Sequence, residues 1–346
     1  MNVPAFKKTV DDIISKINRG LFQPGEQIYS RKEICSIYNV SNMTAYKVHS
    51  ELQRAGVVKT IPGKGLFANV LSTNFLKDSS PQTIDKICFI AGENTIGHGK
   101  EFGNRLIDGI RQRTNELNLN LRIECINTSP YGDMINRKVL SFAPNEGFIT
   151  FAHIYPEMLM PLTDPSISKV LVNRIFPGCR SVLTDNYDGI QSLLKFIVNK
   201  GHRHIVLASG FSASSAEENE NERIYFFEKE AINAKIKWQI ISSGNYYDLL
   251  ELLKGEDPPS AIMFTSDDSA LKFIDILNSK NMKKNIQITG FDDIATETAG
   301  LENMTTYHID CEKMGMAAVD TLVSTNIENM QKYLYKRIPG KLVVRN

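Results

Sequence analysis

Cysteine is scarce in this chain, and long apolar runs are missing. The five cysteines among 346 residues are isolated, which excludes a small disulfide scaffold and favours incidental thiols over metal ligands or nucleophiles. No run approaches the ~18 apolar residues that a spanning helix needs. Asp11 and Asp12 interrupt the N-terminus, so it does not read as a signal peptide. We therefore expect a cytoplasmic protein with no membrane attachment and no metal site.

Net charge is also nearly absent, at +1, but this balance hides two unlike parts. Residues 1–70 hold ten basic and five acidic residues, and the remainder holds thirty and thirty-four, so the two parts carry +5 and −4. A small basic segment before a larger acidic one favours nucleic-acid contact confined to the N-terminal part. The 42% hydrophobic and 23% charged content is ordinary for globular proteins and excludes a disordered chain.

The first 70 residues have the pattern of a winged helix-turn-helix domain. Apolar spacing predicts one helix ending near Arg19-Gly20, a second between Ser30 and Asn39, and a third between Ser41 and Gly56. Ser30 and Glu33 have the spacing of a capping box. The strands 57–60 and 66–70 would then flank a basic, glycine-rich hairpin tip.

This pattern suits DNA, because short polar residues at the start of the third helix can reach base edges while basic residues contact phosphates. The alternative is a small helical cap with solvated lysines. The residues expected to contact DNA are Ser30, Arg31, Lys32, Ser41, Asn42, Met43, Thr44, Tyr46, Lys47, Gly63 and Lys64.

The motifs in this segment resemble the GntR family of winged-helix domains over about residues 5–70. They are Pro24-Gly25-Glu26-Gln27-Ile28, Asn39-Val40-Ser41 with Thr44, Leu52, Gly56 and Gly63-Lys64-Gly65-Leu66-Phe67. The chain departs from the family at Asn42, where Arg is usual, and at Tyr29, where Pro is usual. Because Asn favours adenine and Arg favours guanine, no operator sequence is carried over.

Residues 71–85 are polar and lack periodicity, which predicts a linker. After it, short apolar strands alternate with helices, as expected for parallel sheets covered on both faces. The predicted strands are 87–91, 121–126, 147–151, 170–173, 204–208, 240–241, 261–265 and 287–290, and the predicted helices are 100–117, 188–200, 222–233, 246–254 and 268–280. The expected fold class is α/β, with two doubly wound lobes behind the small winged-helix domain.

Ligands of such sheets bind beyond the carboxyl ends of the strands. Polar residues follow several predicted strands, namely Glu93-Asn94, Asn173-Arg174, Asp267-Asp268 and Asp292-Asp293. Carboxylates and an Arg fork suit a hydroxyl-rich ligand. For any one of these residues a helix cap or turn former is an equal alternative. The aspartates could also suggest a metal or a hydrolytic pair, but no acid/base partner is evident, and we expect no enzyme.

Motifs over residues 86–346 resemble the sensor domain of the LacI/GalR family, in that family's order. They are 200–205, 259–268, 288–294, 304–307 and 342–345. The resemblance implies a periplasmic-binding-protein-like, dimeric effector domain, with lobe 1 at 86–183 plus 310–328 and lobe 2 at 184–309 plus 329–346. It places effector contacts at Asn94, Glu101, Phe102, Phe151, Asn173, Arg174, Arg223, Tyr246, Asp267 and Asp292. It also places Asn186 and Asp185 in structural roles.

Two departures fall near the implied site. Residues 100–103 read Lys-Glu-Phe-Gly where the family has Asn-Pro-Phe-Phe, and Phe226 replaces a glycine three residues after Arg223. The whole chain resembles arabinose-repressor-type hybrids of a GntR head and a LacI body. We expect a homodimeric repressor of carbohydrate-utilisation genes that binds a pseudo-palindromic DNA operator, takes a sugar effector and needs no cofactor. The alternative is a sugar-sensing or solute-binding protein without DNA function.

Overall fold

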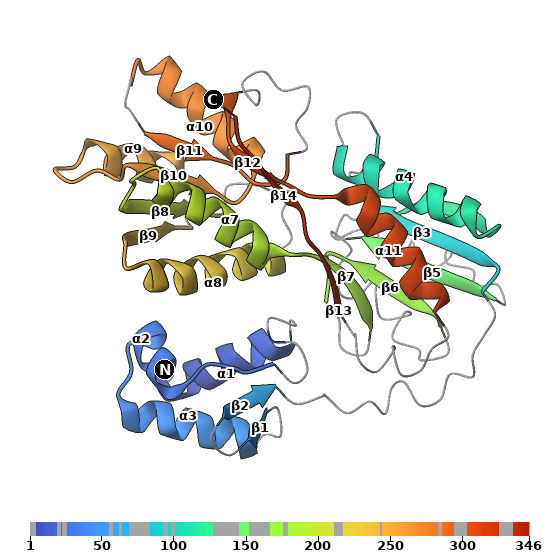
Figure 1. The fold of residues 1–346 in the computed structure, drawn as a ribbon, viewed down its shortest axis with the longest axis horizontal. Coiled ribbons are helices and arrows are strands. Elements are labelled where there is room, and N and C mark those ends of the chain that lie inside the picture. The colour runs from blue at the N-terminus through green and yellow to red at the C-terminus, as the bar shows by residue number, and fades with distance from the viewer. Residues whose placement is uncertain are drawn as a thin grey trace.

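The computed structural model describes residues 5–18, 22, 26–54, 58–61, 64–68, 84–92, 96–97, 101–126, 145–151, 167–175, 179–210, 217–242, 244–282, 286–293, 303–324 and 335–345. These residues form a small N-terminal domain and two α/β lobes (Figure 1). Most of the expected linker, together with Gly63 and Asn94, lies outside the described residues.

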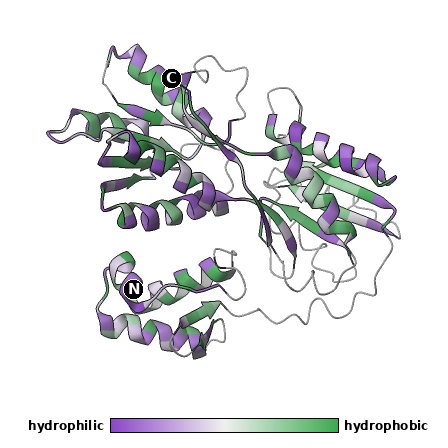
Figure 2. Ribbon diagram, viewed as in Figure 1, coloured by the Kyte–Doolittle hydropathy of each residue, from purple (hydrophilic) through white to green (hydrophobic). Residues whose placement is uncertain are grey.

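The N-terminal domain is a three-helix unit with a two-stranded wing. Its elements are α1 (Ala5–Asn18), α2 (Arg31–Tyr38), α3 (Asn42–Arg54), β1 (Val58–Ile61) and β2 (Gly65–Ala68). The two strands pair antiparallel. The expected capping box is present, since Ser30 Oγ accepts from Glu33 N while Glu33 accepts from Ser30 N. Fully buried Ile13, Ile34 and Leu52 contribute the core, and apolar and polar residues alternate along the helices (Figure 2).

Lobe 1 is built on a six-stranded parallel sheet with the order β13-β7-β6-β5-β3-β4. The strands are β3 (Lys86–Gly92), β4 (Asn120–Ile126), β5 (Glu146–Phe151), β6 (Lys169–Val172), β7 (Arg180–Thr184) and β13 (Tyr335–Ile338). Helices α4 (Glu101–Glu116) and α11 (Cys311–Val323) pack closely on each other because Gly109 and Gly315 lie at the contact, where a Cβ would overlap the backbone of the other helix.

Lobe 2 is built on a four-stranded parallel sheet with the order β11-β10-β8-β9. Its strands are β8 (His204–Ala208), β9 (Lys237–Ile241), β10 (Ala261–Phe264) and β11 (Gln287–Thr289). Its helices are α7 (Asn186–Asn199), α8 (Glu217–Ala234), α9 (Tyr246–Lys254) and α10 (Asp267–Ser279). The pair β12 (Thr306–His308) and β14 (Lys341–Val343) runs antiparallel beside this sheet.

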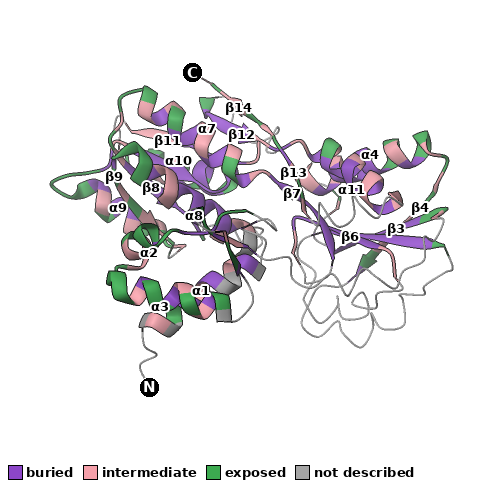
Figure 3. Ribbon diagram, turned by 60° about the horizontal axis from the view of Figure 1, so that its bottom comes forward, coloured by how far each residue is buried: buried purple, intermediate pink, exposed green. Residues whose placement is uncertain are grey.

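Strands β5, β6 and β10 are buried along their whole length, which explains why their sequences are largely apolar instead of alternating. Strand β7 is buried along its whole length too, as Figure 3 shows for β6 and β7. Strand β7 carries Arg180, Ser181 and Thr184 in buried positions. Because a buried parallel strand is predicted from a continuous apolar run and β7 has polar residues at both ends, its sequence does not predict a strand.

The described chain passes between the lobes at three places, which are residues 184–186, 308–311 and 338–341. These crossings are tied together by hydrogen bonds, because Asp185 N donates to Ile338 O and Gly340 N donates to the Tyr307 hydroxyl. The assignment of all of 329–346 to lobe 2 is wrong for β13, which pairs with β7 in lobe 1. The chain returns to lobe 2 only at β14, after the last crossing.

Candidate effector site and DNA-binding surface

The N-terminal half of α3 is exposed and forms the candidate DNA-reading surface. Ala45, Val48 and Leu52 are completely buried and fix one face of the helix to the domain core. The opposite face carries Met43 and Tyr46, which are 66% and 55% exposed although both are large and apolar. Exposed apolar residues on a rigid helix indicate a binding surface.

The start of α3 is fixed by a local cap. Ser41 Oγ accepts from Thr44 N at 3.2 Å and lies 3.0 Å from Thr44 Oγ1. The other expected DNA contacts that the structure describes, Ser30, Arg31, Lys32, Asn42, Lys47 and Lys64, are all exposed. The Arg31 guanidinium lies over the Tyr46 ring, which joins the α2 and α3 contributions into one surface.

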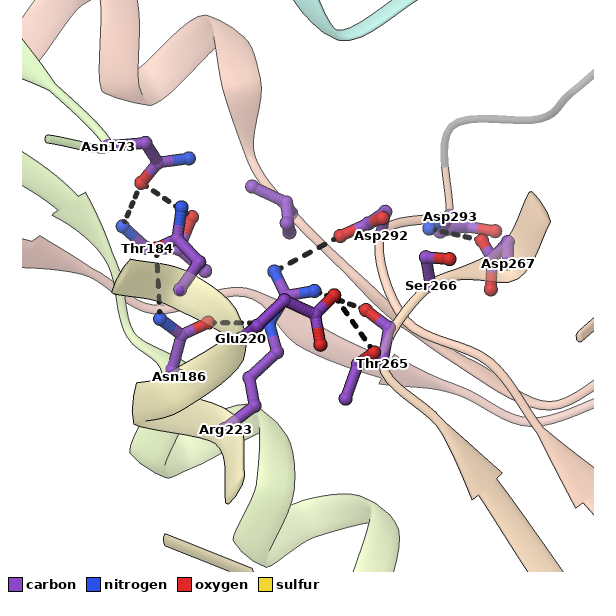
Figure 4. Close-up of polar contacts among 12 residues, drawn as sticks. Asn173, Thr184, Asn186, Glu220, Arg223, Thr265, Ser266, Asp267, Asp292 and Asp293 are labelled. Carbon is purple, nitrogen blue, oxygen red and sulfur yellow. Dashed lines mark hydrogen bonds and ion pairs between the residues drawn. The ribbon is translucent and has the colours of Figure 1, made fainter. Parts of the chain in front are cut away.

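The candidate effector site is centred on Arg223, which lies on α8 and is 4% exposed (Figure 4). Its Nε donates to Asn186 Oδ1 at 2.9 Å, one Nη donates to Thr265 O, and the other reaches Asp292 Oδ1 at 3.2 Å. Its guanidinium also lies 3.8 Å from the centre of the Phe291 ring. These partners lie at the start of α7 and in the segments that follow β10 and β11, and we call the group the Arg223 cluster.

Glu220 adds a second carboxylate to the Arg223 cluster. Glu220 lies one turn earlier on α8 and accepts from Ser209 Oγ at 2.5 Å and from Thr265 Oγ1 at 3.0 Å. Burial raises the pKa of Asp292 to about 7; Arg223 opposes this rise and the Glu220 carboxylate adds to it. Both Glu220 oxygens accept hydrogen bonds within lobe 2, whereas Asp292 bonds Arg223 through Oδ1, so its Oδ2 suits a ligand that donates hydroxyl hydrogens.

The loop that carries Asp292 is bonded directly to a lobe crossing. Asp292 has a φ of 112°, an unusual backbone conformation for a residue other than glycine. Its N donates to Tyr307 O at 2.8 Å, and Ile309 N donates to Asp292 O at 3.1 Å. A ligand that moves Asp292 therefore acts on the segment through which the chain enters lobe 1.

Asp267, predicted from sequence as an effector contact, accepts hydrogen bonds on both of its carboxylate oxygens. Its Oδ1 accepts from Thr306 Oγ1 and its Oδ2 accepts from Asp293 N, both at 2.6 Å. It is 1% exposed, and burial raises its pKa, with the nearby Asp292 charge adding to the effect. Gly290 must be glycine here, because a Cβ would overlap the Asp267 carboxylate. Both oxygens are engaged within lobe 2, so Asp267 holds the Asp292 loop in place.

A polar chain connects the Arg223 cluster to lobe 1. Asn186 Nδ2 donates to Glu222 Oε2 at 2.5 Å, and Glu222 receives both Arg337 Nη groups, at 2.6 and 3.0 Å. Arg337 lies on β13, so this ion pair joins the two lobes. On the lobe 1 side, Asn173 Oδ1 accepts from both the N and Oγ1 of Thr184.

The sequence names Arg223, Asp292 and Asn173 as effector contacts, and this stays a prediction. It does not name Glu220, Glu222, Thr265 or Arg337, and it gives Asn186 a structural role. The spacing of Glu220 and Arg223, three residues apart on one helix, was the available signal. The contacts of Glu222 and Asn186 depend on which helix faces which strand, and the sequence does not show this.

The remaining expected effector residues lie in separate places. In lobe 1, Phe102 at the start of α4 stacks on Phe151 at the end of β5, with ring centres 4.9 Å apart, while Glu101 and Arg174 are half-buried. Tyr246 contacts α10, since its hydroxyl donates to Ser269 O and its ring stacks on Phe273. These contacts do not bring Tyr246 to the Arg223 cluster.

Within the part of the chain that the structure describes, no group of three or more His, Cys, Asp or Glu side chains could hold a metal ion. All five cysteines are unpaired, and no described helix has the length and apolarity needed to cross a membrane.

Comparison with known proteins matches both parts of the chain to families. Residues 6–67 match the gntR family of bacterial regulatory proteins, and residues 194–346 match the periplasmic binding protein-like domain. The chain is therefore a gntR-type DNA-binding domain fused to a periplasmic-binding-protein-like domain. A protein of this construction is a ligand-responsive transcription regulator and not an enzyme.

Individual relatives share this arrangement. The chain is 21% identical to an arabinose metabolism transcriptional repressor of Geobacillus stearothermophilus, over 99% of this chain and 97% of that protein. It is 22% identical to the probable repressor ExuR of Bacillus subtilis, over 85% and 90%. The fold matches a lac repressor dimer bound to operator and an anti-inducer, with a TM-score of 0.56 at 16% identity, over 83% of this chain and 98% of that one.

Proposed function

We propose that the protein is a cytoplasmic, homodimeric repressor of carbohydrate-utilisation genes, released from a pseudo-palindromic DNA operator by a monosaccharide. The observation that carries this is the Arg223 cluster at the strand ends of lobe 2, in the same chain as an exposed recognition helix. The named relatives, one a repressor of arabinose metabolism, support the carbohydrate assignment. No cofactor takes part.

The geometry supports a ligand rich in hydroxyl groups. Asp292 uses one carboxylate oxygen for Arg223, and the side chain is 16% exposed, which leaves the second oxygen to accept from a hydroxyl. A carboxylate acceptor beside an Arg fork binds vicinal hydroxyls through charge-assisted hydrogen bonds. Asn173, Arg174 and the Phe102–Phe151 stack extend the proposed site into lobe 1. Asn94 and Tyr246 belong to the wider proposal only through the family resemblance.

The mechanism follows from the bonds of the Asp292 loop. A ligand held by Asp292 and by lobe 1 residues favours one arrangement of the lobes, because the loop is bonded to the crossing at Tyr307 and Ile309. The ligand can shift the DNA-bound population only by its difference in affinity between the two arrangements. In a two-fold dimer, such a shift changes the spacing of the two recognition helices.

The test is a thermal-shift screen with pentoses, hexoses, deoxyhexoses and their phosphates, followed by a mobility-shift assay on the DNA upstream of the gene. We expect one sugar class to raise the melting temperature and release the DNA. Asp292→Ala should abolish the sugar response and keep DNA binding. Wild-type sugar affinity in calorimetry of that variant would refute the assignment of Asp292. Sugar binding without any DNA binding would favour the solute-binding alternative.

A further inference from the structure

Helix α8 has two functional faces. Glu220 and Arg223 turn toward the strand ends of lobe 2. Tyr225, two residues later, projects from the other side of the helix, since successive residues are rotated by about 100°. That side of α8 lies against the N-terminal domain (Figure 1).

Tyr225 packs into a group of aromatic rings from the DNA-binding domain. Its ring centre lies 5.2 Å from that of Tyr29 and 5.8 Å from that of Phe22, both edge to face. Tyr29 in turn lies edge to face with Tyr38 at 6.2 Å. Tyr225, Phe22 and Tyr29 are each no more than 4% exposed, so this contact excludes water. Edge-to-face packing at these distances is attractive beyond the area it buries.

A lysine organises the polar edge of the same contact. Lys16 Nζ lies 5.7, 5.2 and 5.5 Å from the ring centres of Tyr29, Tyr38 and Tyr225, so it contacts both domains. It also forms an ion pair with Asp12 at 2.9 Å. Across the contact, burial raises the pKa of Glu228 on α8, and Lys16 counteracts that rise.

Two of the sequence departures fall at this contact. Tyr29 stands where the gntR pattern usually has proline, and Phe226 stands where the sensor pattern usually has glycine. Phe226 packs on Tyr225 at 5.1 Å and on Tyr187 of α7 at 5.2 Å, which fixes α8 behind the contact. Both departures therefore place an aromatic ring at the contact between the two domains.

Docking leaves the DNA-reading surface open. The docked residues are Lys16 on α1, Phe22 and Tyr29 between α1 and α2, and Tyr38 at the end of α2. Met43, Tyr46 and Lys47 on α3 stay exposed. The contact with α8 therefore fixes the orientation of the DNA-binding domain relative to lobe 2 and leaves its recognition helix uncovered.

We propose that the Tyr225 face of α8 is a docking site for the chain's own DNA-binding domain, through which the state of the Arg223 cluster controls how firmly that domain is held. Arg223 and Tyr225 lie on one rigid helix, so a change in the bonds of Arg223 that shifts or rotates α8 also moves Tyr225. The docking itself is independent of the proposed function, whereas its use in regulation rests on it.

Hydrogen exchange on the full-length chain tests the docking without DNA or sugar. Tyr225→Ala removes both edge-to-face pairs from the lobe side and leaves the core of the DNA-binding domain intact. We expect exchange in α1 and residues 26–38 to rise by at least about tenfold, since two aromatic pairs are lost. Tyr225→Phe should retain the protection. Ile232→Ala, at a 40% exposed position on the same helix, is the matched control and should change neither segment. Wild-type protection of α1 in Tyr225→Ala would overturn the docking.

A second variant tests whether a change in the Arg223 cluster reaches the docked DNA-binding domain. Asp292→Asn removes the negative charge that pairs with Arg223, and residue 292 contacts no residue of the DNA-binding domain among the bonds described. We expect it to change exchange in α1 as well as around residues 286–293. A change confined to residues 286–293, with α1 unaffected, would overturn the coupling even if Tyr225→Ala confirms the docking. If no sugar binds, that result contradicts the proposed function but not the docking, because neither hydrogen-exchange experiment uses a sugar.

Discussion

Replacement of Arg223 by Met would remove the only cation bonded within the described Arg223 cluster while keeping much of the apolar volume of the side chain. The variant loses the donors to Asn186, Thr265 and Asp292 and the contact with the Phe291 ring. Asp292 is then a buried carboxylate without its counter-charge, and the carboxylate of Glu220 still lies near it.

The loss of stability caused by Arg223→Met is expected to depend on pH. Breaking a buried ion pair on one side typically costs about 3–5 kcal/mol, unless the remaining group becomes neutral. In the wild type the pKa of folded Asp292 is already raised to about 7, above the unfolded value, so its contribution to stability falls as pH rises toward 7. Loss of Arg223 raises this pKa further. The stability of the variant therefore keeps falling above pH 7, where that of the wild type has levelled off. The difference in unfolding free energy between the two grows there by up to about 1.4 kcal/mol per pH unit.

Urea unfolding followed by fluorescence measures this difference. The single tryptophan, Trp238 on β9, lies edge to face with Phe227 of α8 and therefore reports on lobe 2. We expect Arg223→Met to be clearly less stable than wild type at about pH 8 and closer to it at about pH 6. Arg203→Met is the control, since Arg203 is exposed and bonds only backbone oxygens.

A second substitution tests whether Asp292 causes the pH dependence of this stability difference. Adding Asp292→Asn to Arg223→Met removes the titrating group, so the pH dependence of the stability difference should disappear. A pH-independent loss in Arg223→Met itself would refute the inference that Arg223 lowers the pKa that burial raises in Asp292.

Three further predictions concern other parts of the chain. Ser30→Ala removes the capping box with Glu33 and should destabilise the DNA-binding domain by about 1 kcal/mol, measured by thermal unfolding; no change would contradict a role for the cap. Gly315→Ala should cost about 1–3 kcal/mol because α4 leaves no room for the methyl group, whereas Gly255→Ala should be tolerated, since the new Cβ would meet only Leu252 O at 3.4 Å, an ordinary contact. Lys47→Ala should weaken binding to all DNA sequences alike and reduce the salt slope by about 0.9, and an effect confined to one base position would exclude a phosphate contact.

The DNA-binding domain could be predicted almost completely from sequence. Its determinants are local, because the Ser30–Glu33 box, the Ser41 cap and the apolar positions of α3 all act within one or two helical turns. Most strands of the lobes were predictable for the same reason, since a short continuous apolar run indicates a buried parallel strand. Strand β13 is not predicted from sequence, because Lys336 is exposed, Tyr335 and Arg337 are half-buried and only Ile338 is buried, so its charged side chains match an exposed segment.

The candidate site was predictable only in part. Motif resemblance predicts Arg223, Asp292 and Asp267 alike as effector contacts, whereas in the structure the Asp267 carboxylate accepts hydrogen bonds from Thr306 and Asp293. A carboxylate at a strand end has the same sequence signal whether it faces a ligand or supports a loop. The distinction depends on the hydrogen-bond donors that the fold brings to it.

The sequence by itself determined the two-part construction, the recognition helix and the residue types available for effector binding, because caps, periodicity and short motifs act over a few residues. Only the tertiary structure decided that Arg223 meets Asp292, 69 residues away, and that Glu222 pairs with Arg337 across the lobes. It also decided that Tyr225 packs on Phe22 and Tyr29 of the DNA-binding domain. These contacts form because β13 and α8 are brought to those positions by the packing of the whole chain, and no local pattern records where a distant segment returns.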